Sequence, residues 1–139
     1  MKNVIDLSAK FLCETLGIEL ESAKTLGNGL YGSSIPVFKG KEEYHFYLFF
    51  KRDSLKLFAN AFFGSDELVD ADLDDLCKEI ANQIIGKAKN ILNEQEAGGL
   101  YKLGTPEFLG EVAKFHIKLD EKYLYKIKNR TFAIGYKKA

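Results

Sequence analysis

Three polar side chains fall on one line along a helical segment. Residues 73–93 have the apolar periodicity of an amphipathic helix, and within it Asp75, Glu79 and Asn82 follow one another at steps of four and three positions. At about 100° per residue, such steps place all three side chains on one face of a helix. Gly86 continues the same line four positions later. A carboxylate, an amide and bare backbone in this order could dock a partner and position a water molecule as nucleophile.

Two of these residues are unusual choices for an exposed helix. Asn82 is a mediocre helix former, but its uncharged amide both donates and accepts hydrogen bonds. Gly86 costs about 1 kcal/mol relative to alanine in an exposed helix interior. The alternative is an ordinary solvated ridge, in which Asp75 and Glu79 serve the helix dipole near its start. Gly86 favours a functional ridge, because a surface helix gains nothing from glycine unless another backbone comes close.

The opposite side of the same segment is apolar and predicts a helix packed on a core. The residues that gather there are Leu73, Cys77, Ile80, Ala81, Ile84, Ala88, Ile91 and Leu92. Asn93 falls on the polar line with Asn82. Cys77 and Cys13 both lie in apolar helical patterns without a CxxC or Cys/His arrangement, so we expect buried free thiols in a reducing compartment. This points to a cytoplasmic protein.

The other segments predict an α/β fold of the α+β type, with helices packed on a mainly antiparallel sheet in a single domain, residues 1–139. Helices are expected from Val4 to Gly17, from an Asp53 or Ser54 cap to Gly64, and from about 70–72 to 93. A buried strand is expected at 43–51. Extended pieces, including a hairpin, are expected at 19–39, and strands over 100–110, 111–120 and 121–138, the last split by a turn at Asn129 and Arg130.

Composition excludes several classes of function. The chain has 139 residues, of which 46% are hydrophobic and 29% charged, as in an ordinary globular protein. Lys and Arg equal Asp and Glu at 20 each, so no overall field attracts nucleic acid or an anionic membrane. No stretch approaches the roughly 18 apolar residues of a membrane span. Any partner must therefore be recognised locally.

Other polar patterns are weaker candidates. His45 and His116 fall in strand-like patterns without a carboxylate or cysteine at ligand spacing, so both are expected to be ordinary strand residues. The glycine-rich residues 27–34 lack the phosphate-binding patterns GxxxxGK[ST] and GxGxxG. Lysines interleaved with apolar residues near the C-terminus could contact nucleic acid, but the zero net charge favours solubilising lysines on an outer sheet face: Lys126, Lys128, Lys137 and Lys138.

The spacing Asp75-x3-Glu79-x2-Asn82 resembles that of the CheC/CheX family of bacterial chemotaxis phosphatases, specifically its CheX-like branch. The run "QIIGKAK" after Asn82 is similar to the apolar residues, glycine and Ala-Lys of the family, and Pro106 takes the place of its later proline. Residues 83–105 are about two longer than is usual between that asparagine and proline, which fits an insertion in the loop around 94–99. Gln83 replaces a common methionine and is expected to affect packing more than chemistry.

The resemblance implies a fold of helices on an extended sheet, which often dimerises through sheet edges. It also implies hydrolysis of the aspartyl phosphate of the response regulator CheY. Asn82 would then position the attacking water, Glu79 would contact a lysine of the regulator, and Asp75 and Gly86 would contribute to docking. Mg²⁺ would be held by the partner and no cofactor by this chain. The alternatives are a non-catalytic adaptor related to flagellar-switch proteins, and a phosphatase acting on a regulator outside chemotaxis.

Overall fold

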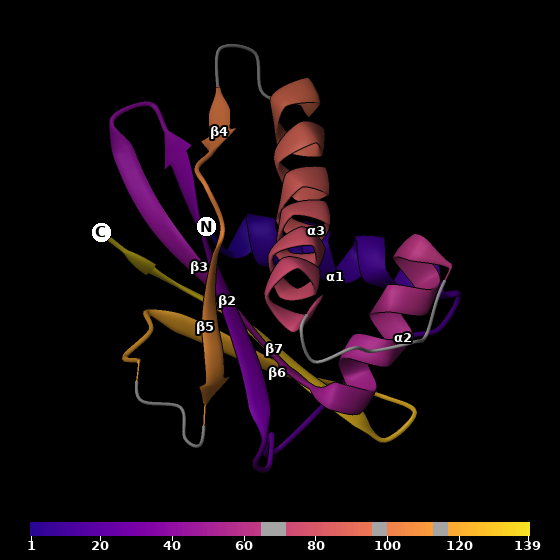
Figure 1. Ribbon diagram of the computed structural model, residues 1–139. Helices are drawn as coiled ribbons and strands as arrows, with labels where there is room; N and C mark the ends of the chain where they lie inside the picture. The colour runs from indigo at the N-terminus through magenta and orange to yellow at the C-terminus, as the bar shows by residue number, and fades with distance from the viewer. Residues whose placement is uncertain (65–71, 96–99, 113–116) are drawn as a thin grey trace.

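The computed structural model describes residues 1–64, 72–95, 100–112 and 117–139. Three helices and seven strands follow one another along this part of the chain (Figure 1). In chain order they are α1 (Lys2–Leu16), β1 (Glu21–Ser22), β2 (Leu30–Lys39), β3 (Glu42–Lys51), α2 (Arg52–Phe63), α3 (Leu73–Gln95), β4 (Tyr101–Leu103), β5 (Glu107–Val112), β6 (Glu121–Ile127) and β7 (Arg130–Lys138).

The strands form one sheet in which all pairings are antiparallel. Its order is β1-β6-β7-β3-β2-β4, and β5 pairs with β2 beside β4. The fold is therefore of the α+β type with helices on an antiparallel sheet, and the predicted fold class is confirmed. The central position of the strand predicted at 43–51 is also confirmed, because β3 lies between β2 and β7.

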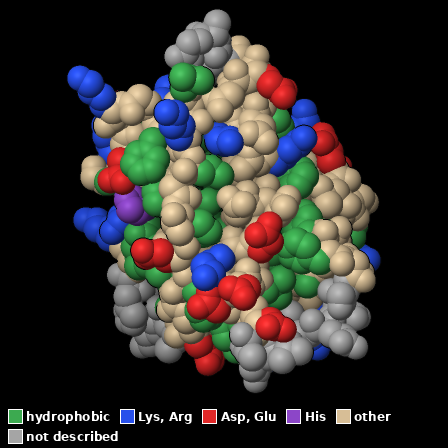
Figure 2. Space-filling model, turned by 45° about the horizontal axis from the view of Figure 1, so that its top comes forward, with side chains coloured by type: hydrophobic (Ala, Val, Ile, Leu, Met, Phe, Trp, Pro, Cys, Tyr) green, Lys and Arg blue, Asp and Glu red, His purple; other side chains and the backbone are tan. Residues whose placement is uncertain are grey.

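Charged side chains of both signs are interspersed over the surface shown in Figure 2, with apolar side chains visible between them. This distribution agrees with a formal net charge of zero. No helix in the described ranges is long and apolar enough to cross a membrane. Recognition of a charged partner must therefore depend on local groups and not on net charge.

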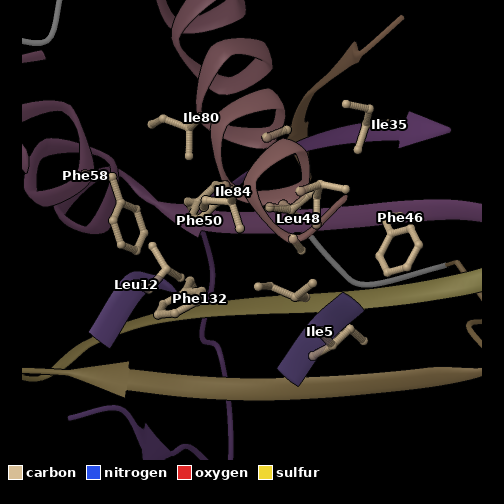
Figure 3. Packing of buried hydrophobic residues seen from close by; sticks show 14 of the residues in the cluster. Ile5, Leu12, Ile35, Phe46, Leu48, Phe50, Phe58, Ile80, Ile84 and Phe132 are labelled. Carbon is tan, nitrogen blue, oxygen red and sulfur yellow. The ribbon is translucent and has the colours of Figure 1, made fainter. Parts of the chain in front are cut away.

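All three helices cover one face of the sheet, and the main core lies between the helices and the sheet (Figures 1 and 3). In Figure 3, Ile84 of α3 points toward the sheet, where Leu48 and Phe50 of β3 lie beside it. Phe50 also meets Phe58 of α2 edge-on, with ring centroids 5.3 Å apart. The predicted apolar side of the long helix is confirmed as core, with Ile91 only half-buried and Ile85 as a further buried member.

The opposite face of the sheet has a smaller buried cluster, made of Leu26, Leu30, Tyr47, Phe49 and Ala133. It explains the continuous apolar run of β3, since successive side chains of a strand point to opposite faces and here both faces bury them. Phe46 and Phe49 are each about 1% exposed or less although they face opposite sides. The strand is buried on both faces, as predicted.

The hairpin predicted within 19–39 is wrong. β1 pairs with β6, and the hairpin instead joins β2 to β3 through a turn at Gly40, which has a positive φ of 60°. Pro36 lies within β2, although proline has no N–H to donate to a neighbouring strand. Its carbonyl accepts a hydrogen bond from the N–H of Gly104 (2.8 Å), so its missing N–H faces the break between β4 and β5 and no bond to β3 is lost.

Other boundaries differ from the prediction at particular residues. The α2 cap on Asp53 or Ser54 is wrong, because the helix begins at Arg52 and the hydroxyl of Ser54 donates to the carbonyl of Thr131 (2.7 Å). The strand predicted over 111–120 is wrong at its end, since β5 stops at Val112 and residues 117–120 are not in a strand. His116 and the predicted helix start at residues 70–71 lie outside the described residues.

Candidate functional site

The polar line on α3 is divided into an open part and a covered part. Asp75, Glu79 and Asn82 are exposed, and the side chain of Asp75 is 87% accessible. Gly86 and Asn93 are only half-exposed, because β4 runs beside the second half of the helix (Figure 1). The expectation of one exposed ridge from Asp75 to Asn93 is therefore wrong for its last two members.

Asn93 holds β4 against α3. Its amide accepts a hydrogen bond from the N–H of Tyr101 (2.7 Å) and donates one to the carbonyl of Tyr101 (3.0 Å). These two bonds from one side chain satisfy both the N–H and the carbonyl of Tyr101. They fix the position of β4, and through it the segment that leads to Pro106, relative to the helix.

The first of two open pockets at the site lies between the start of α3 and the connection from β4 to β5. It has a volume of about 350 Å³ and is lined by Asp75, Lys78, Glu79, Asn82, Thr105 and Pro106. The three polar residues singled out by their spacing thus share one pocket with the proline singled out further along the chain. Helical spacing explains the first grouping, whereas only the tertiary fold brings Pro106 beside them.

The second pocket, also about 350 Å³, crosses the helix at Gly86. Its ends are Phe11 of α1 on one side of α3 and Leu103 of β4 on the other. Asn82 and Gln83 line it one turn before Gly86, and Lys87, Lys89 and Asn90 line the following turn. Glycine leaves a notch across the helix here, and the Asn82 amide belongs to both pockets. Sequence reasoning identified neither this notch nor its lysines.

The acidic start of α3 is partly neutralised. The ammonium of Lys78 lies 2.7 Å from a carboxylate oxygen of Asp74 and 3.7 Å from one of Asp75. The hydrogen bond to Asp74 is the main reason why the pKa of Lys78 is raised, so this lysine stays charged. Asp75 is the more distant and more exposed partner of this lysine, while Glu79 has no ion pair within the described ranges.

Gln83 holds the carboxylate of Glu79. Its side-chain amide donates a hydrogen bond to Oε1 of Glu79 (3.2 Å) from one helical turn away. Gln83 is exposed, so the expected packing role of this position is wrong, while an effect of the position on the chemistry stays a prediction. The spacing i, i+4 between a glutamate and a glutamine was a usable signal for this contact. The side-chain amide of Asn82 makes no hydrogen bond to another residue in the described part of the chain.

Other chemistry-bearing residues lie away from the pockets. Cys77 is buried in the core, where desolvation and the nearby Asp74 raise its pKa to about 12, so it is an unreactive thiol. His45 is a half-buried residue of β3, 3.6 Å from Glu43. Lys126 pairs with Glu21 (3.6 Å) in the sheet. In the described part of the chain, no group of three or more His, Cys, Asp and Glu side chains could hold a metal ion.

Residues 33–122 match the family model described as "Chemotaxis phosphatase CheX". This span includes Pro106 and the residues of α3 that line the two pockets. The chain belongs to the CheX family. The matched span runs from β2 to the start of β6 and so includes the Asp75, Glu79 and Asn82 line together with Pro106. No curated protein matches the chain by sequence.

Solved structures of the CheX and CheC type share this fold over almost their whole length. The chemotaxis protein CheX from Vibrio vulnificus has a TM-score of 0.74 at 15% identity, covering 99% of this chain and 97% of that one. A CheC-like protein from Shewanella oneidensis MR-1 has a TM-score of 0.71 at 16% identity, with 100% and 97% covered. CheX in the CheX–CheY–BeF3–Mg²⁺ complex from Borrelia burgdorferi has a TM-score of 0.67 at 13% identity, with 99% and 96% covered.

Proposed function

We propose that this protein hydrolyses the aspartyl phosphate of a CheY-type chemotaxis response regulator. Membership of a family described as chemotaxis phosphatases supports this reaction class. The observation that carries the proposal is the Asn82 amide, exposed on a helix that packs on the core and shared by two pockets beside Glu79 and Pro106. In the structure from Borrelia burgdorferi a CheX protein is in complex with CheY, BeF3 and Mg²⁺, and we extend a CheY-type partner to this chain.

Asn82 would act by positioning. The amide can accept a hydrogen bond from a water molecule through its oxygen and donate one through its nitrogen, so it can fix the water in line with the phosphorus. The water oxygen bonds to phosphorus while the bond from phosphorus to the aspartate oxygen breaks. Inorganic phosphate leaves with the oxygen and both protons of the water, and the regulator's carboxylate is restored. Orientation is the main contribution a protein can make to this reaction.

The remaining site residues would dock the partner. Glu79, oriented by Gln83, presents a carboxylate that suits the lysine expected beside the regulator's phosphoryl group. Asp75 would contribute at the edge of the first pocket, and Gly86 would let the partner's surface approach the helix. Mg²⁺ bound in the regulator would supply charge neutralisation at the phosphoryl oxygens, and this chain would bring no metal of its own.

The test is to mix the protein with CheY phosphorylated by a small-molecule phosphodonor in Mg²⁺ and to follow phosphate release. Asn82→Ala should lower kcat about a hundredfold or more with little change in KM, because it removes positioning and leaves the docking groups. Glu79→Ala should raise KM and lower kcat, because it removes an orienting contact.

Asn60→Ala on the exposed side of α2 is the matched control and should behave as the unmodified protein. Hydrolysis by Asn82→Ala at the unmodified rate would contradict the proposal. Binding of phosphorylated CheY without any hydrolysis by the unmodified protein would favour the adaptor instead.

A further inference from the structure

The charges of α3 change sign along its exposed side. Asp74, Asp75 and Glu79 lie in its first two turns, and Lys87 and Lys89 lie beyond the notch at Gly86. Glu94, in the last turn, does not line either pocket. Lys78, in the acidic part, is neutralised by its two aspartates. Lys87 and Lys89 have no acidic residue three or four positions away on the helix, and no ion pair with them occurs within the described ranges. Their charge is therefore available to a partner.

Helix stability does not account for these two lysines. Cations stabilise a helix through its dipole only near the last turn, and the last turn of α3 has no basic residue. They also form no stabilising i, i+4 pair of the kind that Lys78 makes with Asp74. Both instead line the second pocket, together with the neutral amides of Gln83 and Asn90. Cations beside uncharged donors suit a carboxylate-bearing ligand.

We propose that this second pocket is a docking site for an acidic segment of the phosphorylated regulator, with Lys87 and Lys89 as its charged groups. The inference rests on the proposed function and adds a specificity determinant to it. Because the notch is continuous with the position of Asn82, a partner engaged there places its phosphoryl group within reach of the amide. The opposite charges of the two pockets fix the direction in which the partner lies along the helix.

This site selects partners by charge. A regulator with acidic groups facing the lysines and a basic group facing Glu79 is complementary at both pockets, and a regulator with the reverse order meets like charges at both. Electrostatic complementarity at an interface changes association rates and partner choice more than it changes the chemical step. The effect falls with added salt, because exposed charges are screened within about 8 Å at physiological ionic strength.

The test compares Lys87→Gln/Lys89→Gln with Lys10→Gln/Lys56→Gln. The control loses the same charge from exposed positions on α1 and α2, outside both pockets. Binding to CheY with Mg²⁺ and beryllofluoride is measured by calorimetry, and phosphate release is measured at low and at high salt. The first variant should raise both Kd and KM about tenfold at low salt with kcat within twofold, and should show a weaker salt dependence.

Equal Kd, KM and salt dependence in the two double variants would overturn the inference. Lys87→Gln alone, at an exposed position, separates a docking effect from any loss of folding at the half-buried Lys89. Asn82→Ala measured in parallel distinguishes the two proposals: if it has lost hydrolysis while the lysine variant equals its control, only the inference fails. Absence of binding by the unmodified protein would overturn both.

Discussion

Two asparagines on the same line of α3 have opposite environments. The amide of Asn93 makes two hydrogen bonds to the backbone of Tyr101, whereas the amide of Asn82 is exposed where two pockets meet. Helical spacing assigns both to one face, and residue type does not distinguish them. The difference arises because β4 reaches only the second half of the helix, which leaves the first half for a partner.

Gln83 should matter through Glu79. Its hydrogen bond of 3.2 Å limits the rotamers of an exposed carboxylate, so that less conformational entropy is lost when a partner binds. We expect Gln83→Met to raise KM for phosphorylated CheY about threefold and to leave kcat and the free energy of unfolding almost unchanged, because exposed pairs on a helix contribute only about 0.5 kcal/mol or less. Steady-state kinetics and urea unfolding measure the two quantities.

Gln83→Glu is the matched comparison. It keeps the length of the side chain but places a like charge one turn from Glu79, so KM should rise more than in Gln83→Met. If both variants retain the KM of the unmodified protein, Gln83 does not position Glu79 for docking. If Gln83→Glu/Glu79→Ala shows the same KM as Glu79→Ala, the effect of position 83 passes through Glu79.

At the scale of elements, α3 is a rod fixed on one side by the core and at its second half by β4. Gly86 lies beside β4 and also lines the second pocket. A Cβ added there would lie 3.5 Å from Cδ1 of Leu103, which is an ordinary van der Waals contact. The approach of β4 therefore does not require glycine, and the cost of glycine in the helix has no explanation in the isolated fold.

Gly86→Ala should stabilise the protein and impair docking. The free energy of unfolding should rise by about 1 kcal/mol, because alanine has the higher helix propensity and no clash opposes it. KM for phosphorylated CheY should rise severalfold, because the notch becomes shallower. Urea unfolding and phosphate release measure the two effects, and Gly86→Leu should raise KM further. A more stable Gly86→Ala with an unchanged KM would remove Gly86 from the docking surface.

The elements that sequence predicted well are those whose pattern is local. Apolar spacing and the glycines Gly17 and Gly64 located α1 and α2, and both glycines adopt the left-handed conformation at the helix ends. β2 was predicted only as short extended pieces, and not as one strand of ten residues, because its Gly, Ser and Pro residues are typical of turns. These residues fit within the strand because of neighbours that are distant in the sequence. A side chain at Gly32 would clash with Phe49, and Pro36 faces the break between β4 and β5.

The part of the site that sequence could predict is likewise the part that depends on a local pattern. Asp75, Glu79 and Asn82 share a face because of helical geometry alone, which sequence is sufficient to predict. Their position beside Pro106 depends on how β4 and β5 pair with β2, and no local pattern contains that register. The notch required knowledge of what lies on both sides of α3, so its lysines became candidates only with the fold.

At the scale of the whole molecule, one core between three helices and one sheet holds the site in place. Cys77 lies within it at 0% exposure. Desolvation, with a smaller effect of Asp74, raises its pKa from 9.0 to about 12 in the folded protein. The folded chain thus keeps a proton that the unfolded chain releases. Stability from this group is fully present below pH 9 and is lost progressively as the pH rises from 9 toward 12.

We therefore expect the free energy of unfolding, measured with urea, to fall by about 1 kcal/mol more between pH 9 and pH 10 than it does in Cys77→Ala. The alanine variant will be less stable at every pH because it leaves a small cavity, but its pH dependence over this interval lacks the contribution of the thiol. Tyr125, whose pKa burial raises from 10.0 to about 12, adds a similar loss at higher pH in both proteins. Parallel curves for the two proteins between pH 9 and pH 10 would show that the thiol ionises as readily in the folded chain as in the unfolded one.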